Sequence, residues 1–187
     1  NTFCSHEYYN ADGFCEACGA YQKAIKSGEY YEIYNAGQLF WFAKQFNDSK
    51  IPDNSNLKLM KDIEIPGGHD WTSIGDMDGK SFQGNIEGNY HVISGLRPAA
   101  DGTSRKGLVA RIQDGKVQNI GLVLEDGWTF GLCHTAVGTN IQNCFVVGTD
   151  FSNSCSNGTV TNCLAVSGKL EGNKYPNDYR ATFTNCY

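Results

Sequence analysis

Apolar residues recur along most of this chain in short alternating bursts, which are separated by Gly, Asn, Asp or Ser. Clear examples occupy 117–124 and 141–147, where an Asn interrupts the apolar positions. Bursts of this length are too short for helices. They predict short β-strands joined by turns.

The bursts belong to a repeated segment. Gly107-Leu108-Val109 corresponds to Gly131-Leu132-Cys133, and Val117-Gln118-Asn119-Ile120 corresponds to Ile141-Gln142-Asn143-Cys144, both at an offset of 24 residues. The ending recurs at 160–163 and 183–186, so its Asn residues lie 24, 19 and 23 residues apart. Three short strands and their turns take about 20–25 residues, and such rungs stack about 4.8 Å apart. The pattern predicts an all-β fold, a parallel β-helix (solenoid) whose units cannot bury their apolar faces alone.

Two side chains recur at fixed positions of the repeat. The first is the Asn, at 119, 143, 162 and 185. Its amide can donate to one neighbouring rung and accept from the other, so these residues predict a hydrogen-bonded ladder. The second is a Cys at 144, 163 and 186, predicted to stack as buried thiols because the rung spacing exceeds the roughly 3.8 Å between the Cβ atoms of a disulfide.

Two further cysteines fit the repeat less well. Cys133 aligns with Val109, an interior position, whereas Cys155 lies in a turn rich in Ser and Asn. A disulfide between Cys133 and Cys155 therefore stays open as an alternative to two thiols.

Residues 35–46 predict a helix. Asn35 is a suitable N-cap and Gln38 completes a capping box. One helical stripe is apolar and consists of Leu39, Phe42, Ala43 and Phe46. We expect this helix to close the otherwise open end of the solenoid. Residues 57–65 then alternate like a half-buried strand. The expected organisation is an appendage and linker at 1–28 and a capped β-helix at 29–187, with the cap helix at about 35–47 and rungs at about 57–187.

Part of the chain resembles a known family. The runs WTSIGD at 71–76 and FQGNIEGNYHVISGL at 82–96 look like the opening rungs of right-handed β-helix surface proteins of bacteria, and 106–124 resembles their glycine-rich GLUG repeat. The family includes adhesins and protease-associated regions, so the resemblance implies a right-handed β-helix at the cell surface. Phe145 and Val146 depart from it, since small or polar residues are common there.

The sharpest chemical signal lies near the N-terminus. Cys4-Ser5-His6 followed by Cys15-Glu16-Ala17-Cys18 supplies four soft or borderline ligands, the number that a closed tetrahedral zinc site needs. Gly19 permits the tight turn of such a knuckle. A segment of about 20 residues needs a metal or a disulfide to fold, so Cys4, His6, Cys15 and Cys18 are predicted to hold structural zinc, with a disulfide among the three cysteines as the alternative. Similar knuckles precede repeats in Gram-positive surface proteins.

Composition excludes several partners. The net charge is −5 and 19% of residues are charged, without strong Lys/Arg clusters, which argues against nucleic acid and against anionic membranes. No run of about 18 apolar residues occurs, so no membrane insertion is expected. Asn47-Asp48-Ser49 and Asn157-Gly158-Thr159 match the glycan acceptor pattern, which matters only for a eukaryotic source.

Because β-helices also carry polysaccharide lyases and hydrolases, catalytic residues were sought. Asp114, Asp126 and Asp150 are candidate acids, but each lies in a turn away from Arg. Cys133 and His134 are adjacent on a strand and point to opposite faces. His91 is more simply structural. The expectation is that the chain is not an enzyme.

Two weaker ligand signals have simpler structural explanations. The turns at 69–70 and 76–79 offer oxygen ligands for calcium, although solvated turn acids are far more common and are the favoured explanation. The tyrosines of 21–34 could form a sugar platform, or they could join the knuckle to the cap by packing, which we favour.

The sequence thus predicts a non-catalytic extracellular structural or adhesive module of a microbial surface protein. Its last repeat ends at Tyr187 with no cap behind it, which suggests a longer parent protein, stacking of another subunit, or a partner strand. Expected partners are a second copy or a host or glycan surface. The alternative is a carbohydrate-active enzyme or a carbohydrate-binding module on the β-helix face.

Overall fold

The computed structural model describes residues 4–76, 78–99, 107–125, 128–166, 168–169 and 181–187. Strands dominate, and the described residues contain one α-helix, α1 (Ala36–Asn47). The predicted all-β class is therefore confirmed. The strands are β1 (Ile25–Ser27), β2 (Tyr30–Ile33), β3 (Asn56–Leu59), β4 (Ile63–Glu64), β5 (Asn85–Leu96), β6 (Val109–Gln113), β7 (Lys116–Leu124), β8 (Phe130–Val137), β9 (Asn140–Gln142), β10 (Phe145–Val147), β11 (Asp150–Ser156), β12 (Thr159–Thr161), β13 (Leu164–Val166) and β14 (Thr182–Thr184).

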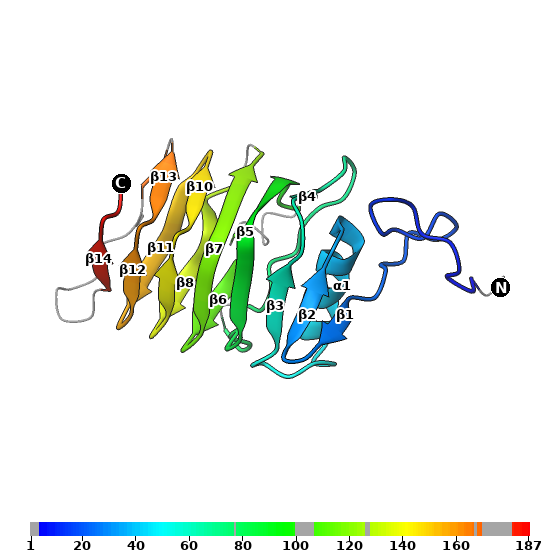
Figure 1. Cartoon of the computed structure of the whole chain (residues 1–187), viewed down its shortest axis with the longest axis horizontal. Helices are drawn as coiled ribbons and strands as arrows, with labels where there is room; N and C mark the ends of the chain where they lie inside the picture. Colours follow the sequence, from blue (N-terminus) through cyan, green and yellow to red (C-terminus); the bar gives the residue numbers. More distant parts are fainter. Residues whose placement is uncertain (1–3, 77, 100–106, 126–127, 167, 170–180) are drawn as a thin grey trace.

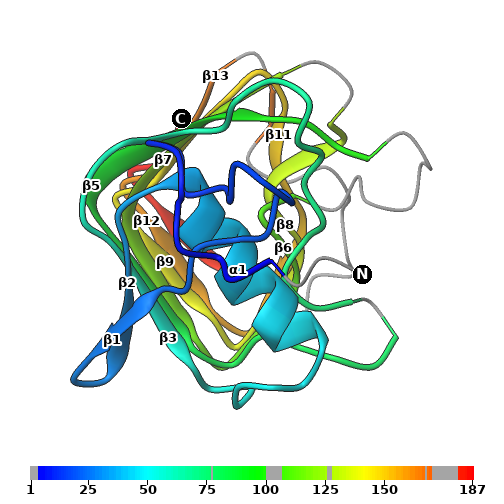
Figure 2. The ribbon, with the colours of Figure 1, turned by 90° about the vertical axis from the view of Figure 1, so that its right-hand side faces the viewer.

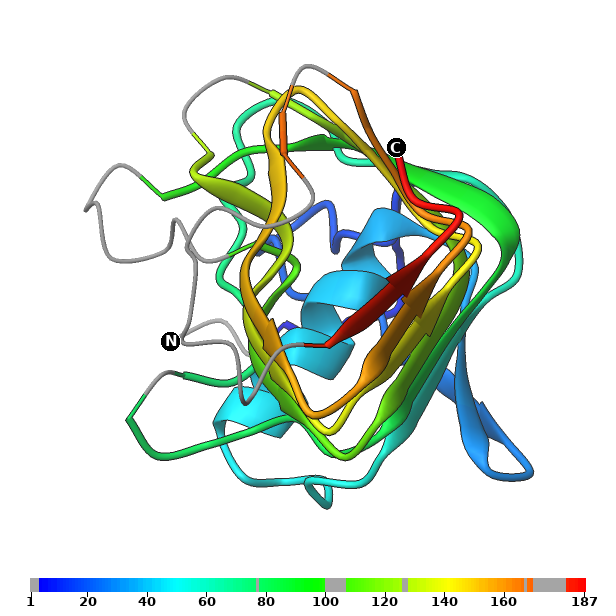
Figure 3. The ribbon, with the colours of Figure 1, turned by 90° about the vertical axis from the view of Figure 1, so that its left-hand side faces the viewer.

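The strands form two sheets that run along the molecule (Figure 1). The larger has the order β1-β2-β3-β5-β7-β9-β12-β14, with β10, β13 and β4 paired beside this path, and the smaller has the order β11-β8-β6. Pairing is parallel except between β1 and β2. Viewed from the C-terminal end, the strands surround a common interior (Figure 3).

The register pairs each repeat with the next one. Val117 pairs with Ile141 and Val109 with Cys133, so the 24-residue offset of the sequence is also the offset between neighbouring strands. One row of partners is buried throughout and consists of Leu57, Ile86, Val117, Ile141 and Val160. The strand expected over 57–65 is instead two, β3 and β4, because the chain bends between Met60 and Asp62.

Helix α1 lies across the N-terminal end of the sheets (Figure 2). The Asn35 side chain accepts a hydrogen bond from the Gln38 amide at 2.9 Å, and the Gln38 side chain accepts from the Tyr34 amide at 2.7 Å, which confirms the predicted N-terminal capping. The apolar stripe is buried against the segment that precedes β5: the Phe46 ring lies 5.5 Å from that of Phe82, and both are fully buried.

The predicted asparagine ladder is present. Nδ2 of Asn143 donates to Oδ1 of Asn119 at 2.9 Å, Asn162 donates to Asn143 at 3.2 Å, and Asn185 donates to Asn162 at 3.2 Å. All four residues have positive φ, between 51° and 58°. Asn is favoured here because it tolerates the left-handed conformation while its amide links neighbouring repeats.

None of the eight cysteines, all of them among the described residues, forms a disulfide. Cys144 and Cys163 are buried in the interior, and burial raises the pKa of Cys144 well above its ordinary value. The register pairs Cys133 with Ser152 and Cys155 with Ala136, so the sheet does not place Cys133 directly opposite Cys155. Within the described residues, no helix has the length and apolar character needed to cross a membrane.

Candidate metal centre

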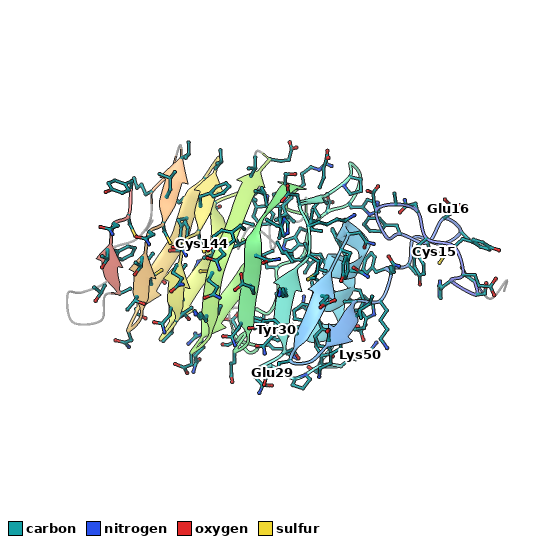
Figure 4. The ribbon with its side chains drawn as sticks, viewed as in Figure 1. Cys15, Glu16, Glu29, Tyr30, Lys50 and Cys144 are labelled. Atoms are coloured by element: carbon teal, nitrogen blue, oxygen red, sulfur yellow. The ribbon has the colours of Figure 1, made fainter. Side chains whose placement is uncertain are left out.

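The N-terminal segment folds by a series of tight turns. Tyr9 and Cys15 form an antiparallel bridge, the Cys15 amide donates to the Ala20 carbonyl at 2.8 Å, and the Gly19 amide donates to the Cys15 carbonyl at 2.7 Å. Gly19 has φ +71°, a conformation that glycine adopts without strain. These turns bring 15–18 back against residues 4–9. Figure 4 shows Cys15 at this end, away from the strands.

The four predicted ligands converge. Their ligand atoms, contributed by Cys4, His6, Cys15 and Cys18, all lie within 4.8 Å of one another. Sγ of Cys4 lies 3.4 Å from Sγ of Cys15, and Sγ of Cys18 lies 3.3 Å from Nδ1 of His6. The cluster could hold a metal ion. A tetrahedral site with metal–sulfur distances of about 2.3 Å needs sulfur atoms about 3.8 Å apart, so the 3.4 Å between Cys4 and Cys15 would have to widen slightly.

The electrostatics favour a thiolate at Cys15. Its pKa falls from 9.0 to about 6, chiefly because the His6 side chain hydrogen bonds to it, and also because the amides of Ala17 and Cys18 donate to its sulfur. For Cys4, the His6 amide lowers the pKa, but hydrogen bonds to Cys15 and Cys18 together with burial raise it above 9.0. Main-chain amides directed at thiolates are a feature that stabilises metal-binding knuckles.

The cluster is reached from solvent on one side. Cys18 and His6 are exposed, whereas Cys15 is 4% exposed. A cavity of about 300 Å³ adjoins the sulfur atoms and is lined by 4–8 and 15–17. A metal held here would be anchored at Cys15 and accessible from the His6 side.

A second set of contacts docks this segment on the cap helix. The Gly37 amide donates to the Asp12 carbonyl at 2.7 Å. Phe14 is 3% exposed, its ring stacks 3.9 Å from that of His69, and it meets the Phe40 ring edge-on at 5.7 Å. Sequence reasoning missed both Phe14 and Gly37. The sequence did carry a signal for Phe14: an aromatic residue directly precedes the Cys15-x-x-Cys18 motif, and a segment too short for its own core must bury such a residue against another element.

The candidate catalytic residues do not form a site in the described part of the chain. Asp150 accepts a hydrogen bond from the Lys169 amide at 2.8 Å, and Asp114 is exposed in a turn. Asp126 lies outside the described residues. Cys133 is 1% exposed, and its burial raises its pKa well above the ordinary value, which is unsuited to a nucleophile. His91 pairs with Asp62 at 3.1 Å.

The two turns considered for calcium carry other contacts. One oxygen of Asp76 accepts hydrogen bonds from the amides of Asp78 at 3.0 Å and Lys80 at 2.9 Å, and His69 stacks on Phe14. In the tyrosine-rich linker, the Tyr31 ring is buried and lies 5.5 Å from that of Phe42, whereas Tyr21 and Tyr30 are partly exposed and Tyr34 is exposed.

Comparison of the chain with protein-family models, with curated proteins and with solved structures found no match. The resemblance to β-helix surface proteins with GLUG repeats therefore stays a prediction.

Proposed function

We propose that this chain is a non-catalytic structural and adhesive module of a microbial cell-surface protein, built as a right-handed parallel β-helix and clamped at its N-terminus by structural zinc. The observation that carries the proposal is the convergence of Cys4, His6, Cys15 and Cys18 on a segment that is docked on the cap helix. Three thiols and one imidazole form a closed donor set for Zn²⁺, which leaves no open position for catalysis.

The pairing pattern supports the solenoid. Successive repeats pair in parallel in chain order, and one row of inward side chains continues through β3, β5, β7, β9 and β12. Right-handed winding is the general rule for parallel strands joined by crossover connections. The asparagine ladder then links the rungs at one corner, which makes the body a stiff spacer.

Self-association is proposed at the C-terminal end. Strand β14 pairs with β12 and with no other described strand. On the face formed by β7, β10 and β13, of which β13 is the last described strand, the outward side chains are apolar and partly exposed: Val123, Val147 and Val166 form one row along the body, and Leu164 pairs with Phe145 in the next. A contiguous exposed apolar face of this kind usually marks an interface.

The opposite end of the body is covered by α1, and the edge strand of the large sheet there is the short antiparallel strand β1. A head-to-tail filament therefore lacks a matching edge. Two copies are proposed to meet tail to tail, with twofold symmetry.

Sedimentation velocity over a concentration series tests the association. We expect a dimer that grows with concentration and is lost in Leu164→Glu, because each copy would bury an unpaired carboxylate. Gln83→Glu adds the same charge at an exposed loop position and should leave the dimer intact. A monomer at every concentration would refute the association.

Two further experiments test the bound zinc and the absence of catalysis. Native mass spectrometry should show one bound metal ion, and Cys15→Ala should remove it. Reproducible turnover of neutral or acidic polysaccharides, lost in Asp126→Ala, would instead establish an enzyme.

A further inference from the structure

A hollow of about 250 Å³ lies outside the metal cluster, at the junction of the linker, the cap helix and the segment after β4. Its lining comes from all three: Tyr21 from the linker, one face of α1, and 70–72. The α1 face is a second helical stripe, spaced i, i+3, i+4, i+7, which adjoins the stripe that faces the strands and shares Ala43 with it. It consists of Phe40, Ala43, Lys44 and Asn47.

Aromatic side chains form the inner wall of the hollow. The Phe40 ring meets the Trp71 ring edge-on at 5.1 Å and lies 5.4 Å from the Tyr21 ring. Trp71 is fully buried and its Nε1 donates to the Leu108 carbonyl at 3.3 Å, so this wall is fixed in place. Tyr21 is partly exposed and offers ring surface to a ligand.

Polar groups surround the opening. Lys44 pairs with Asp48 at 3.1 Å, which holds both side chains at the rim. Asp70 and Thr72 are exposed and make no hydrogen bond or ion pair with another described residue, so their oxygen atoms are available to a ligand. An aromatic wall with a few polar groups at its rim is the general composition of a small-molecule site.

Size and charge restrict the ligand. Sites for drug-sized ligands have volumes of about 300–1,000 Å³, so this smaller hollow suits a single ring. The lining carries the carboxylates of Asp48 and Asp70 and the ammonium group of Lys44, and Lys50 outside the lining also pairs with Asp48 at 3.5 Å. The opening is therefore close to neutral and offers no excess positive charge for phosphate, sulfate or uronate groups. A ligand with an apolar face for Tyr21 and hydroxyl groups for Asp70 and Thr72 matches the remaining features.

We propose that this hollow binds one hexose residue, neutral or carrying an amino group, with its apolar face on Tyr21 and its hydroxyl groups on Asp70 and Thr72. The carbohydrate-binding alternative considered above then belongs to the cap junction rather than to a face of the β-sheets. The proposal depends neither on self-association nor on the nature of the metal.

Saturation-transfer NMR of the whole chain with glucose, galactose, mannose, glucosamine and glucuronate tests this. We expect at least one of the first four to bind and to shift the Trp71 indole signal, with glucuronate weaker. The double variant Asp70→Asn/Thr72→Val should raise the Kd at least tenfold, while Asp78→Asn, at another exposed turn carboxylate, should not change it. Because Asp70 and Thr72 are exposed, the melting temperature should stay the same.

Absence of binding by all five sugars at tens of millimolar would refute the proposal. Equal weakening by the double variant and by Asp78→Asn would refute this location. Failure of either kind leaves the zinc and association experiments unaffected, since they use other residues.

Discussion

Oε1 of Glu87 accepts a hydrogen bond from Nδ2 of Asn119 at 3.1 Å, and this contact ends the asparagine ladder at its N-terminal side. Each side-chain amide of the ladder donates to the Asn of the preceding repeat. Asn119 is the first Asn of the ladder, so its amide needs an acceptor that is not an Asn. A carboxylate fills that position. It also accepts from Gln118 and from the Asn89 amide, at 2.7 Å for the latter.

Stability should therefore fall in mild acid through Glu87. Burial raises its pKa, but hydrogen bonds from Gln118, Asn119 and the Asn89 amide outweigh this and hold the pKa below its ordinary 4.5. The lowered pKa contributes stability that is present above the unfolded-state value and is lost as pH falls through the folded-state value. Urea midpoints measured from about pH 6 to about pH 3 should show a steeper acid decline in the wild type than in Glu87→Gln. Glu64→Gln, at an exposed position of β4, should leave the decline unchanged.

Two substitutions of Asn143 separate the contribution of its side-chain hydrogen bonds to stability from the contribution of its left-handed backbone conformation. Asn143→Gly removes the donor to Asn119 and the acceptor for Asn162 but keeps the left-handed backbone, at a cost of about 1–3 kcal/mol in the free energy of unfolding. Asn143→Ala should cost about 1–2 kcal/mol more, because φ +53° strains a residue with a Cβ. Equal denaturation midpoints for the two variants would show that the backbone conformation contributes nothing.

His6 should control the Cys15 thiolate before any metal binds. In the metal-free protein, thiolate absorbance should include one group titrating near the Cys15 pKa of about 6. His6→Ala should move this group toward 9.0, because the His6 hydrogen bond is the largest cause of the lowering. The stability linked to Cys15 is complete only above 9.0 and is lost as pH falls through about 6. Cys133→Ala is the control, since that thiol is buried far along the chain and its loss should leave the step near 6 as it is.

Gly37 of α1 should be essential for stability, because the N-terminal segment packs directly against it. Replacing Gly by Ala inside a helix normally stabilises by about 1 kcal/mol. At Gly37 the added Cβ would lie 1.9 Å from the Gly13 carbonyl oxygen, so Gly37→Ala should lower the melting temperature and speed proteolysis within 10–22. Gly67→Ala meets only the end of the Arg97 side chain at 3.4 Å and should be close to neutral. If both variants melt alike, the segment is not docked as described.

The two glycan acceptor sites should differ in a glycosylating host. Nδ2 of Asn47 donates to the Ser73 carbonyl at 3.0 Å, and its Oδ1 accepts from the Gly75 amide at 2.8 Å, so its amide is held by the main chain. Asn157 is exposed in a turn. Glycopeptide mass spectrometry should find modification at Asn157 and little or none at Asn47. Modification of Asn47 in the folded protein would contradict these contacts.

The sequence by itself determined the features that repeat locally. The 24-residue offset became the strand register, and the recurring Asn became a ladder, because pairing neighbouring copies of one segment aligns identical positions. The cap helix was predictable from Asn35 and Gln38 because capping depends on residues only three positions apart. The cluster of Cys4, His6, Cys15 and Cys18 was predictable because ligand spacing is itself a local property.

Only the tertiary structure decided how distant segments meet. Phe14 stacks on His69, Glu87 ends a ladder that begins 32 residues later, and Tyr21 reaches the hollow beside Trp71. No local pattern encodes such pairs, since each depends on how the N-terminal segment, the cap and the first strands pack together. The bend that divides 57–65 into β3 and β4 has the same origin: alternation predicts strand conformation, whereas pairing with β5 decides where each strand ends.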